Sequence, residues 1–96
     1  MPQMRVPLER QALMSAPDPN AELATLRRAI DGIDDALAEL LMCRMCLSHQ
    51  AQELKTTAGI PIYDRRREIE IQERYERHWC GASAVARAIL HWCRED

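Results

Sequence analysis

The chain has 96 residues, the size of one domain, and only three of them are glycine. Its 13 basic and 15 acidic residues give a formal net charge of −2, which argues against a general affinity for nucleic acid. The sequence contains no apolar run of about 18 residues, so we expect no membrane-spanning helix. Residues 1–7 lack the pattern of a secretory signal, and we therefore expect a cytoplasmic protein with reduced thiols.

The first part of the chain differs in composition from the rest. Residues 1–17 contain three of the five prolines and no sustained apolar periodicity. We therefore expect a mobile N-terminal tail over residues 1–17 and one helical domain over residues 18–96.

Apolar residues recur at steps of three and four over residues 23–55, which predicts one long helix. This apolar stripe consists of Leu23, Leu26, Ile30, Ile33, Leu37, Leu40, Leu47, Ala51 and Leu54. Asp18 followed by Pro19 is a good helix start, and the segment from Thr56 to Pro61 is a good helix end. Such a helix spans about 50 Å at roughly 1.5 Å per residue, more than a domain of this size is wide. We therefore expect it to be the shared spine of a homodimer.

Two shorter helices are predicted after the long one. Asp64 is a suitable N-cap for a helix that continues to about Trp79 and ends before Gly81. The residues expected to face inward on this helix are Ile71, Tyr75 and Trp79. Ser83 is a suitable N-cap for a third helix, whose inward residues would be Val85, Ile89, Trp92 and Cys93. The predicted fold is therefore all-α, with one long, one medium and one short helix.

One charged residue interrupts the apolar stripe. Arg44 stands between Leu40 and Leu47, where the pattern requires an apolar side chain. Because a guanidinium stays charged and is costly to bury alone, we expect an anionic partner. Lys55 follows close to three turns later and Ser48 one turn later, on nearly the same face. This face either binds an anionic ligand, most simply a dicarboxylate, or pairs Arg44 with a glutamate of another helix and leaves Lys55 solvated.

Other polar residues carry weaker signals. Asp64, Arg67 and Glu68 share one face at the start of the second helix, although charged clusters there are usually solvated. The four cysteines lack the spacing of a zinc site, so we expect no metal and interpret them as small core residues. No histidine is arranged with a nucleophile, and no phosphate-binding glycine loop is present, so we expect neither a covalent mechanism nor a cofactor.

Together, these residues resemble a known family. The segment LRRAIDGID over residues 26–34, then Arg44 and Lys55, then IPIYDRRRE over residues 60–68, is similar to the all-helical (AroQ-class) chorismate mutases. The resemblance implies an intertwined homodimer of three-helix chains with two equivalent active sites. It also implies rearrangement of chorismate to prephenate, a pericyclic reaction that needs no cofactor, metal or covalent intermediate. Such a reaction gains from holding a reactive conformer and from donors at the ether oxygen.

The resemblance implies a role for each matching residue. Arg27 matches an arginine that reaches into the partner's site and binds a substrate carboxylate. Arg44 matches the arginine that holds a carboxylate within its own chain, and Lys55 matches the lysine that donates to the ether oxygen and a carboxylate. On the second helix, Asp64 and Glu68 match the carboxylates near the ring hydroxyl of the substrate. Arg67 matches a further arginine of the site. The residues expected to be catalytic are Arg27, Arg44, Lys55 and Glu68.

The third helix departs from the family pattern. The family usually supplies a Gln or Glu there as a second donor to the ether oxygen, and the alignment puts that position at or just beyond Asp96. Either Glu95 substitutes, the site is incomplete, or a partner completes it. One short subclass of these mutases is activated in a complex with a 3-deoxy-heptulosonate-phosphate synthase, which is therefore a candidate partner.

Two alternative functions stay open. One is a relative on the same scaffold, an isochorismate-pyruvate lyase or an amino-deoxychorismate mutase. The combination of Asp64, Arg67 and Glu68 favours ordinary chorismate over these substrates. The other is a non-catalytic helical dimer that acts as an interaction or regulatory module, which the missing third-helix donor supports.

Overall fold

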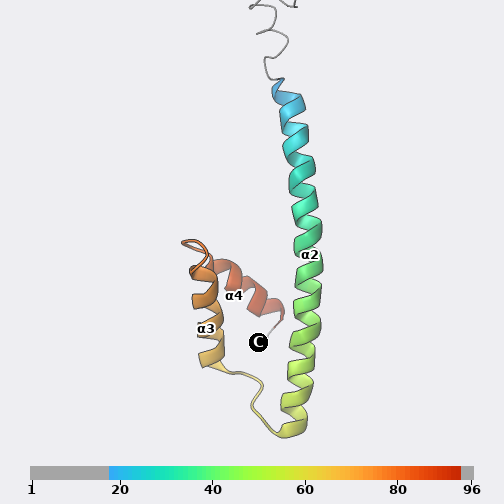
Figure 1. Ribbon diagram of the computed structural model, residues 1–96. Coiled ribbons are helices and arrows are strands. Elements are labelled where there is room, and N and C mark those ends of the chain that lie inside the picture. Colours follow the sequence, from blue (N-terminus) through green and yellow to red (C-terminus); the bar gives the residue numbers. More distant parts are fainter. Residues whose placement is uncertain (1–17, 94–96) are drawn as a thin grey trace, which may run out of the picture. The chain divides into compact units, whose positions relative to one another are not determined.

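The computed structural model describes residues 18–93, so the tail expected over residues 1–17 lies outside the described range. In chain order, the helices are α2 (Pro19–Ala58), α3 (Arg65–Glu76) and α4 (Ser83–Trp92) (Figure 1). The described residues form no strand, which confirms an all-α chain with one long, one medium and one short helix. Over residues 18–93, no helix combines the length and the apolarity needed to cross a membrane.

The long helix α2 begins and ends where the sequence predicts. The Asp18 carboxylate accepts a hydrogen bond from the backbone N–H of Asn20 at 3.0 Å, which caps the first turn. At the other end Gly59 has a φ of 72°, and the N–H of Ile60 donates to the carbonyl of Lys55 at 2.8 Å. Because glycine adopts a positive φ without a Cβ clash, it ends the helix in a Schellman motif.

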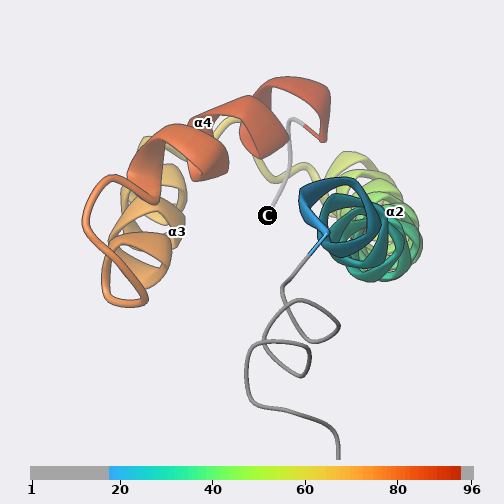
Figure 2. The same cartoon turned by 90° about the horizontal axis from the view of Figure 1, so that it is seen from above.

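The helices α3 and α4 pack against each other (Figure 2). Ile71 of α3 and Ala86 and Leu90 of α4 are each at most 3 % exposed, and Tyr75 packs on them. These residues belong to the second of two units into which the chain divides, with the boundary after Leu37. The first unit contains the N-terminal half of α2 and the second contains the rest of the described helices. The core of the second unit is therefore small.

The connection between α3 and α4 depends on Glu76. Its carboxylate accepts hydrogen bonds from the backbone N–H groups of Gly81 and Ser83, each at 2.8 Å. These N–H groups lie at the start of α4, where no helical carbonyl can pair with them. The hydrogen bond from Gly81, then that from Ser83, lowers the pKa of the Glu76 carboxyl below its usual value. One carboxylate at the end of α3 therefore caps the start of α4.

The predicted end of α3 and the predicted cap of α4 were both wrong. α3 ends at Glu76 rather than near Trp79, because the chain turns there and brings Gly81, with a φ of 94°, back to the Glu76 carboxylate. Ser83 is the first residue of α4, and the N-cap is Ala82, which makes no side-chain hydrogen bond. The Glu76 carboxylate serves the role that we expected of the Ser83 hydroxyl.

The inward faces of α3 and α4 were predicted only in part. The predictions for Ile71, Tyr75 and Cys93 are confirmed, and Ile89 is half-buried. Three other residues were predicted to face inward, and these predictions were wrong. The exposed residues are Trp79, Val85 and Trp92. On α4 the face toward the core is filled by small or aliphatic residues, namely Ala82, Ala86 and Leu90. Larger side chains at neighbouring positions therefore project outward.

The described chain leaves the apolar stripe of α2 uncovered. Every residue from Pro19 to Leu40 is exposed. Along the stripe, the large apolar side chains from Leu23 to Leu54 are between 43 % and 67 % exposed. Among the described helices, α3 and α4 are the pair whose backbones lie close together. An apolar row of this length is a surface that another element is expected to cover.

We expect Glu76→Gln to destabilise the chain in a pH-dependent way, because a neutral amide accepts the two N–H groups more weakly than a carboxylate. The folded pKa of Glu76 is lowered, so its stabilisation is present in full above the usual value of 4.5 and is lost as the pH falls through the folded pKa. The urea midpoint of the variant should therefore lie below that of the wild type near pH 7. The gap should narrow as the pH falls below about 4.5.

The matched control is Glu73→Gln, the same change on α3 at a side chain that makes no hydrogen bond or ion pair with the described residues. Its urea midpoint should stay close to that of the wild type at pH 7. Equal midpoints for Glu76→Gln and Glu73→Gln at pH 7 would contradict the capping role of Glu76.

Candidate functional site

Two predicted site cations lie half-buried on one face of α2. Arg44 donates from Nη1 to the hydroxyl of Ser48 at 3.2 Å, one turn further along the helix. Ser48 is 5 % exposed and is the buried polar side chain of the described chain. Lys55 donates from Nζ to the carbonyl oxygen of Ile62 at 3.1 Å. These contacts hold both cations on the face that their spacing predicts.

The end of α2 positions Lys55. The turn at Gly59 reverses the chain, so that the carbonyl of Ile62 meets the Lys55 ammonium from the segment before α3. The backbone carbonyl of Lys55 also accepts the N–H of Ile60 in the same turn. The motif that ends the helix therefore also restricts the side chain of a predicted catalytic residue.

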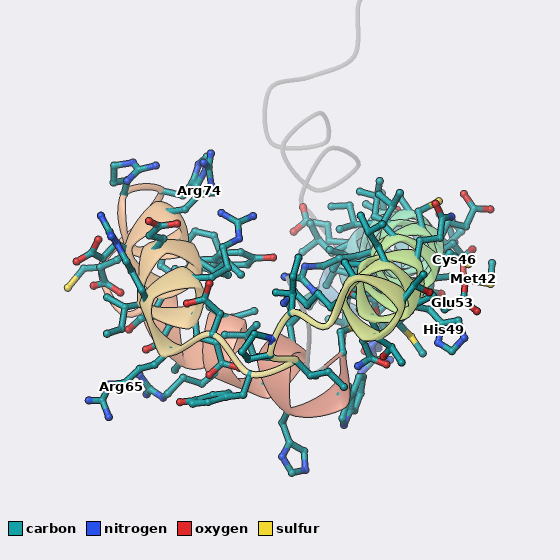
Figure 3. The ribbon with its side chains drawn as sticks, turned by 90° about the horizontal axis from the view of Figure 1, so that it is seen from below. Met42, Cys46, His49, Glu53, Arg65 and Arg74 are labelled. Carbon is teal, nitrogen blue, oxygen red and sulfur yellow. The ribbon has the colours of Figure 1, made fainter. Side chains whose placement is uncertain are left out.

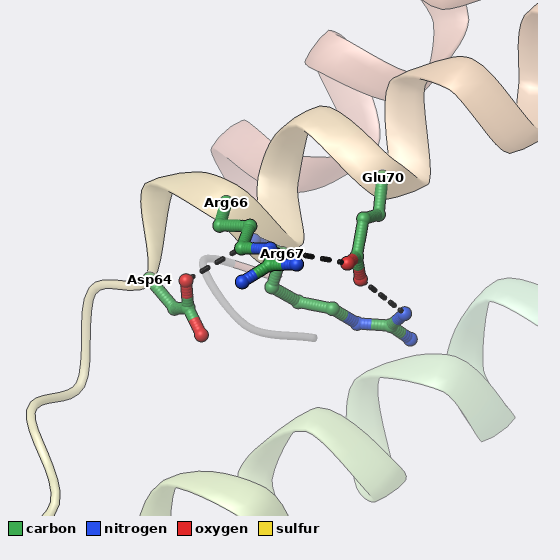
Figure 4. Close-up of polar contacts among 4 residues, drawn as sticks. All are labelled: Asp64, Arg66, Arg67 and Glu70. Atoms are coloured by element: carbon green, nitrogen blue, oxygen red, sulfur yellow. Dashed lines mark hydrogen bonds and ion pairs between the residues drawn. The ribbon is translucent and has the colours of Figure 1, made fainter.

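The start of α3 brings together Asp64, Arg67 and Glu68. The Asp64 carboxylate accepts a hydrogen bond from the backbone N–H of Arg67 at 3.1 Å (Figure 4). The Asp64 carbonyl accepts the N–H of Glu68, also at 3.1 Å. Asp64 is thus the N-cap of α3, as the sequence predicts, and its negative charge suits the positive end of the helix dipole. The hydrogen bonds that start the helix also group these three residues.

The three consecutive arginines of α3 differ in their surroundings. Arg67 is half-buried, with Nη1 at 3.6 Å from Oε1 of Glu70, whereas Arg66 is exposed, with Nε at 3.9 Å from Oε2 of Glu70 (Figure 4). Arg65 points outward from the helix (Figure 3). Ion pairs as exposed as these are weak, so a ligand carboxylate can compete with Glu70 for Arg67. Arg67 is therefore the arginine of this run that is best placed to bind a ligand.

Glu68 has a buried oxygen atom without a hydrogen-bond partner. Its Oε2 accepts no hydrogen bond from the described residues. A buried carboxylate oxygen without a donor is costly, and such groups in folded proteins need an explanation. Oε2 is therefore a buried side-chain atom of the described chain whose hydrogen-bonding capacity is unused.

Two other residues of the expected site are not tested. Arg27 lies on the exposed N-terminal half of α2, in the first unit, and the contacts described above all involve residues of the second unit. Its role in the site of a partner chain stays a prediction. Glu95, the candidate replacement for the third-helix donor, lies outside the described residues.

The interpretation of the cysteines as core residues is confirmed only for Cys93. Cys43, Cys46 and Cys80 are exposed. Figure 3 shows Cys46 projecting outward from α2 together with Met42, His49 and Glu53. Over residues 18–93, no group of three or more His, Cys, Asp or Glu residues is arranged to hold a metal ion. Cys43, Cys46 and Cys80 thus lie outside the core of the described chain.

The sequence analysis placed Ser48 on the same helix face as Arg44 but assigned it no functional role. Besides accepting from Arg44, it lines a cavity of about 160 Å³ between α2 and the end of α4. The other lining residues are Met45, His49, Gln52, Trp92 and Cys93. The signal in the sequence is a serine one turn after an arginine on an otherwise apolar stripe. Its burial depends on the position of α4, which spacing within α2 does not reveal.

Comparison with known proteins places these residues in context. The sequence model of the family described as chorismate mutase type II matches residues 26–95. A bifunctional chorismate mutase/prephenate dehydratase of Aquifex aeolicus is 36 % identical over 77 residues, which are 77 % of this chain and 21 % of that protein. A T-protein of Enterobacter agglomerans is 46 % identical over 48 residues, 50 % of this chain and 13 % of that protein.

A third relative is closer in length. The chorismate mutase of Methanocaldococcus jannaschii is 40 % identical over 53 residues, which are 55 % of this chain and 54 % of that protein. The chain thus spans between 13 % and 54 % of the length of these curated relatives. No solved structure matches at the same level of significance. The family match nevertheless covers most of the chain, together with every described residue of the expected site, and the protein belongs to the chorismate mutase type II family.

Proposed function

We propose that the protein catalyses the rearrangement of chorismate to prephenate. Membership of the chorismate mutase type II family supports this activity, as does the similarity to relatives whose names include chorismate mutase. The observation that carries the proposal is the arrangement of charged side chains that the fold holds in place. Arg44 and Lys55 are half-buried on α2, and Arg67 and Glu68 are half-buried at the start of α3.

The proposed mechanism needs only positioning and electrostatic stabilisation. Arg44 binds a substrate carboxylate, for which the planar guanidinium is well suited. Lys55 donates to the ether oxygen, where negative charge grows as the C–O bond breaks and the new C–C bond forms within the same molecule. Glu68, half-buried at the start of α3, accepts a hydrogen bond from the ring hydroxyl through its carboxylate. Holding the side chain of chorismate over its ring supplies the remaining rate enhancement.

The working unit in this proposal is a homodimer in which α2 packs along α2 of a second copy. The uncovered apolar stripe supports this arrangement, because its large side chains stay exposed in the described chain. Arg27 adjoins Leu26, a residue of the stripe that is 60 % exposed. Association along the stripe would therefore bring the Arg27 guanidinium to the neighbouring chain, where it would bind a carboxylate of the same substrate.

Two further expectations stay predictions. They are the cytoplasmic location and the complex with a 3-deoxy-heptulosonate-phosphate synthase. No contact in the described chain bears on either of them.

The proposal is tested by following the loss of chorismate absorbance on addition of the purified protein, with prephenate identified as the product. Arg44→Ala should lower kcat/KM by about 10²- to 10³-fold, because it removes a charged donor that stabilises the bound substrate and transition state. The control is Arg74→Ala, which removes an exposed arginine that points outward from α3 (Figure 3) and should leave kcat/KM unchanged.

Three results would contradict this proposal in different ways. Equal activity of Arg44→Ala and wild type would exclude the assigned site. Turnover of isochorismate or amino-deoxychorismate in place of chorismate would indicate one of the related activities. A folded dimer that turns over none of the three substrates would support the non-catalytic module.

The shared site makes a separate prediction about mixed dimers. Arg27→Ala and Arg44→Ala should each be nearly inactive alone, but mixing them should restore activity after subunit exchange. Each mixed dimer contains one site with both arginines, and half of the dimers are mixed at random exchange, so recovery should approach about a quarter of wild-type kcat. Exchange is verified by the masses of dimers carrying a tag on one variant. Verified exchange without recovered activity would exclude the role of Arg27 in the partner's site.

A further inference from the structure

The hydrogen bond between Arg44 and Ser48 is the feature of the site that the proposed mechanism does not use. Ser48 accepts from Nη1 of Arg44 at 3.2 Å and is 5 % exposed. A buried serine on a surface helix is unusual, because a small polar side chain gains little from burial and loses its contact with water. Its burial beside a half-buried arginine suggests a role for the contact itself.

A hydroxyl group is well suited to orient a guanidinium. An arginine side chain is flexible, and its planar fork binds a carboxylate strongly only in the correct plane. The serine oxygen takes one of the five N–H donors and carries no charge. It can therefore restrict the plane of the fork without neutralising the cation, which a carboxylate at the same position would do.

Water has little access to the Ser48 side of this contact, because Ser48 is 5 % exposed. Trp92 and Cys93 line the same cavity of about 160 Å³ as Ser48, and Cys93 is itself buried. Because a hydrogen bond is stronger where water competes less for its donor and acceptor, the contact restricts Arg44 more than an exposed contact would.

A second arginine–hydroxyl contact on α2 provides the comparison. Arg28 donates from Nη2 to the hydroxyl of Thr25, also at 3.2 Å, but both residues are exposed. The two pairs share the helix, the type of donor and acceptor, and the distance between them. They differ in burial and in the predicted role of the arginine.

We propose that Ser48 is a positioning residue that holds the Arg44 guanidinium in the plane required to bind a substrate carboxylate. This inference rests on the proposed function, because it assigns a task to Ser48 through Arg44. Ser48 acts on the substrate only through the arginine. Loss of the Ser48 hydroxyl therefore weakens the binding of the substrate carboxylate and leaves the rate of the chemical step nearly unchanged.

The test compares Ser48→Ala, Ser48→Cys and Ser48→Thr by steady-state kinetics with chorismate. Ser48→Ala should raise KM about tenfold and change kcat by less than about threefold, because a carboxylate anchor acts in both the ground state and the transition state. Ser48→Cys fills nearly the same volume but accepts hydrogen bonds weakly, so it should show the same increase. Ser48→Thr keeps the hydroxyl and should recover most of the loss. Thr25→Ala should leave both constants unchanged.

A double-mutant cycle separates positioning from a structural role. In the Arg44→Ala background, Ser48→Ala should cause no further change in kcat/KM, because the side chain that Ser48 orients is absent. A purely structural effect would lower kcat/KM by the same factor in both backgrounds. Circular dichroism and the urea midpoint of each variant verify that the chain is folded.

Specific outcomes overturn the inference. These are an unchanged KM in both Ser48→Ala and Ser48→Cys, or the same loss with and without Arg44. In either case, the proposed function would still stand if the wild-type protein turns over chorismate and Arg44→Ala loses that activity. Absence of chorismate turnover by the wild-type protein would instead refute the proposed function and this inference with it.

Discussion

The fold depends on the apolar stripe of α2, whose large side chains the described chain leaves exposed. The core of the second unit consists of a few residues of α3 and α4, which is little for a domain of this size. A helix of 40 residues with an uncovered apolar face needs another surface to bury that face. A second copy of the chain is the partner that we propose, and the predicted site residues Arg44 and Lys55 lie along the same helix.

The site residues are positioned by the interactions that form the helices. Asp64 caps α3 and thereby groups Arg67 and Glu68 at its start. The turn that ends α2 at Gly59 brings a carbonyl group to Lys55. The proposed reaction requires only that the protein hold charged groups and hydrogen-bond donors in the correct positions around the substrate. Local folding motifs are therefore sufficient to hold several residues of the proposed site in place.

Features that depend on neighbouring residues were predicted well from the sequence. The start of α2 at Asp18 and Pro19, its end near Gly59, and the cap at Asp64 all involve residues within a few positions of each other. Arg44 was recognised because it interrupts an apolar pattern. The role of Arg67 and Glu68 came from the resemblance rather than from spacing, since a cluster of charges at a helix start is usually solvated.

Features that depend on packing were predicted poorly. Trp79, Val85 and Trp92 were predicted to face inward, but the small residues of α4 fill the core-facing side. Glu76 reaches backbone groups five and seven residues further on, so its capping role cannot be inferred from helix patterns alone. The burial of Ser48 depends on the position of α4, and the unpaired oxygen of Glu68 is likewise visible only in three dimensions.

The central claim is that the exposed face of α2 is completed by a second chain and that the site works only in that assembly. It is tested most directly by measuring molecular mass by sedimentation velocity and kcat/KM for chorismate over the same series of dilutions. We expect the mass of two chains wherever the protein is active, and a loss of kcat/KM that follows dissociation into single chains. A species with the mass of one chain that retains the full kcat/KM would contradict the account.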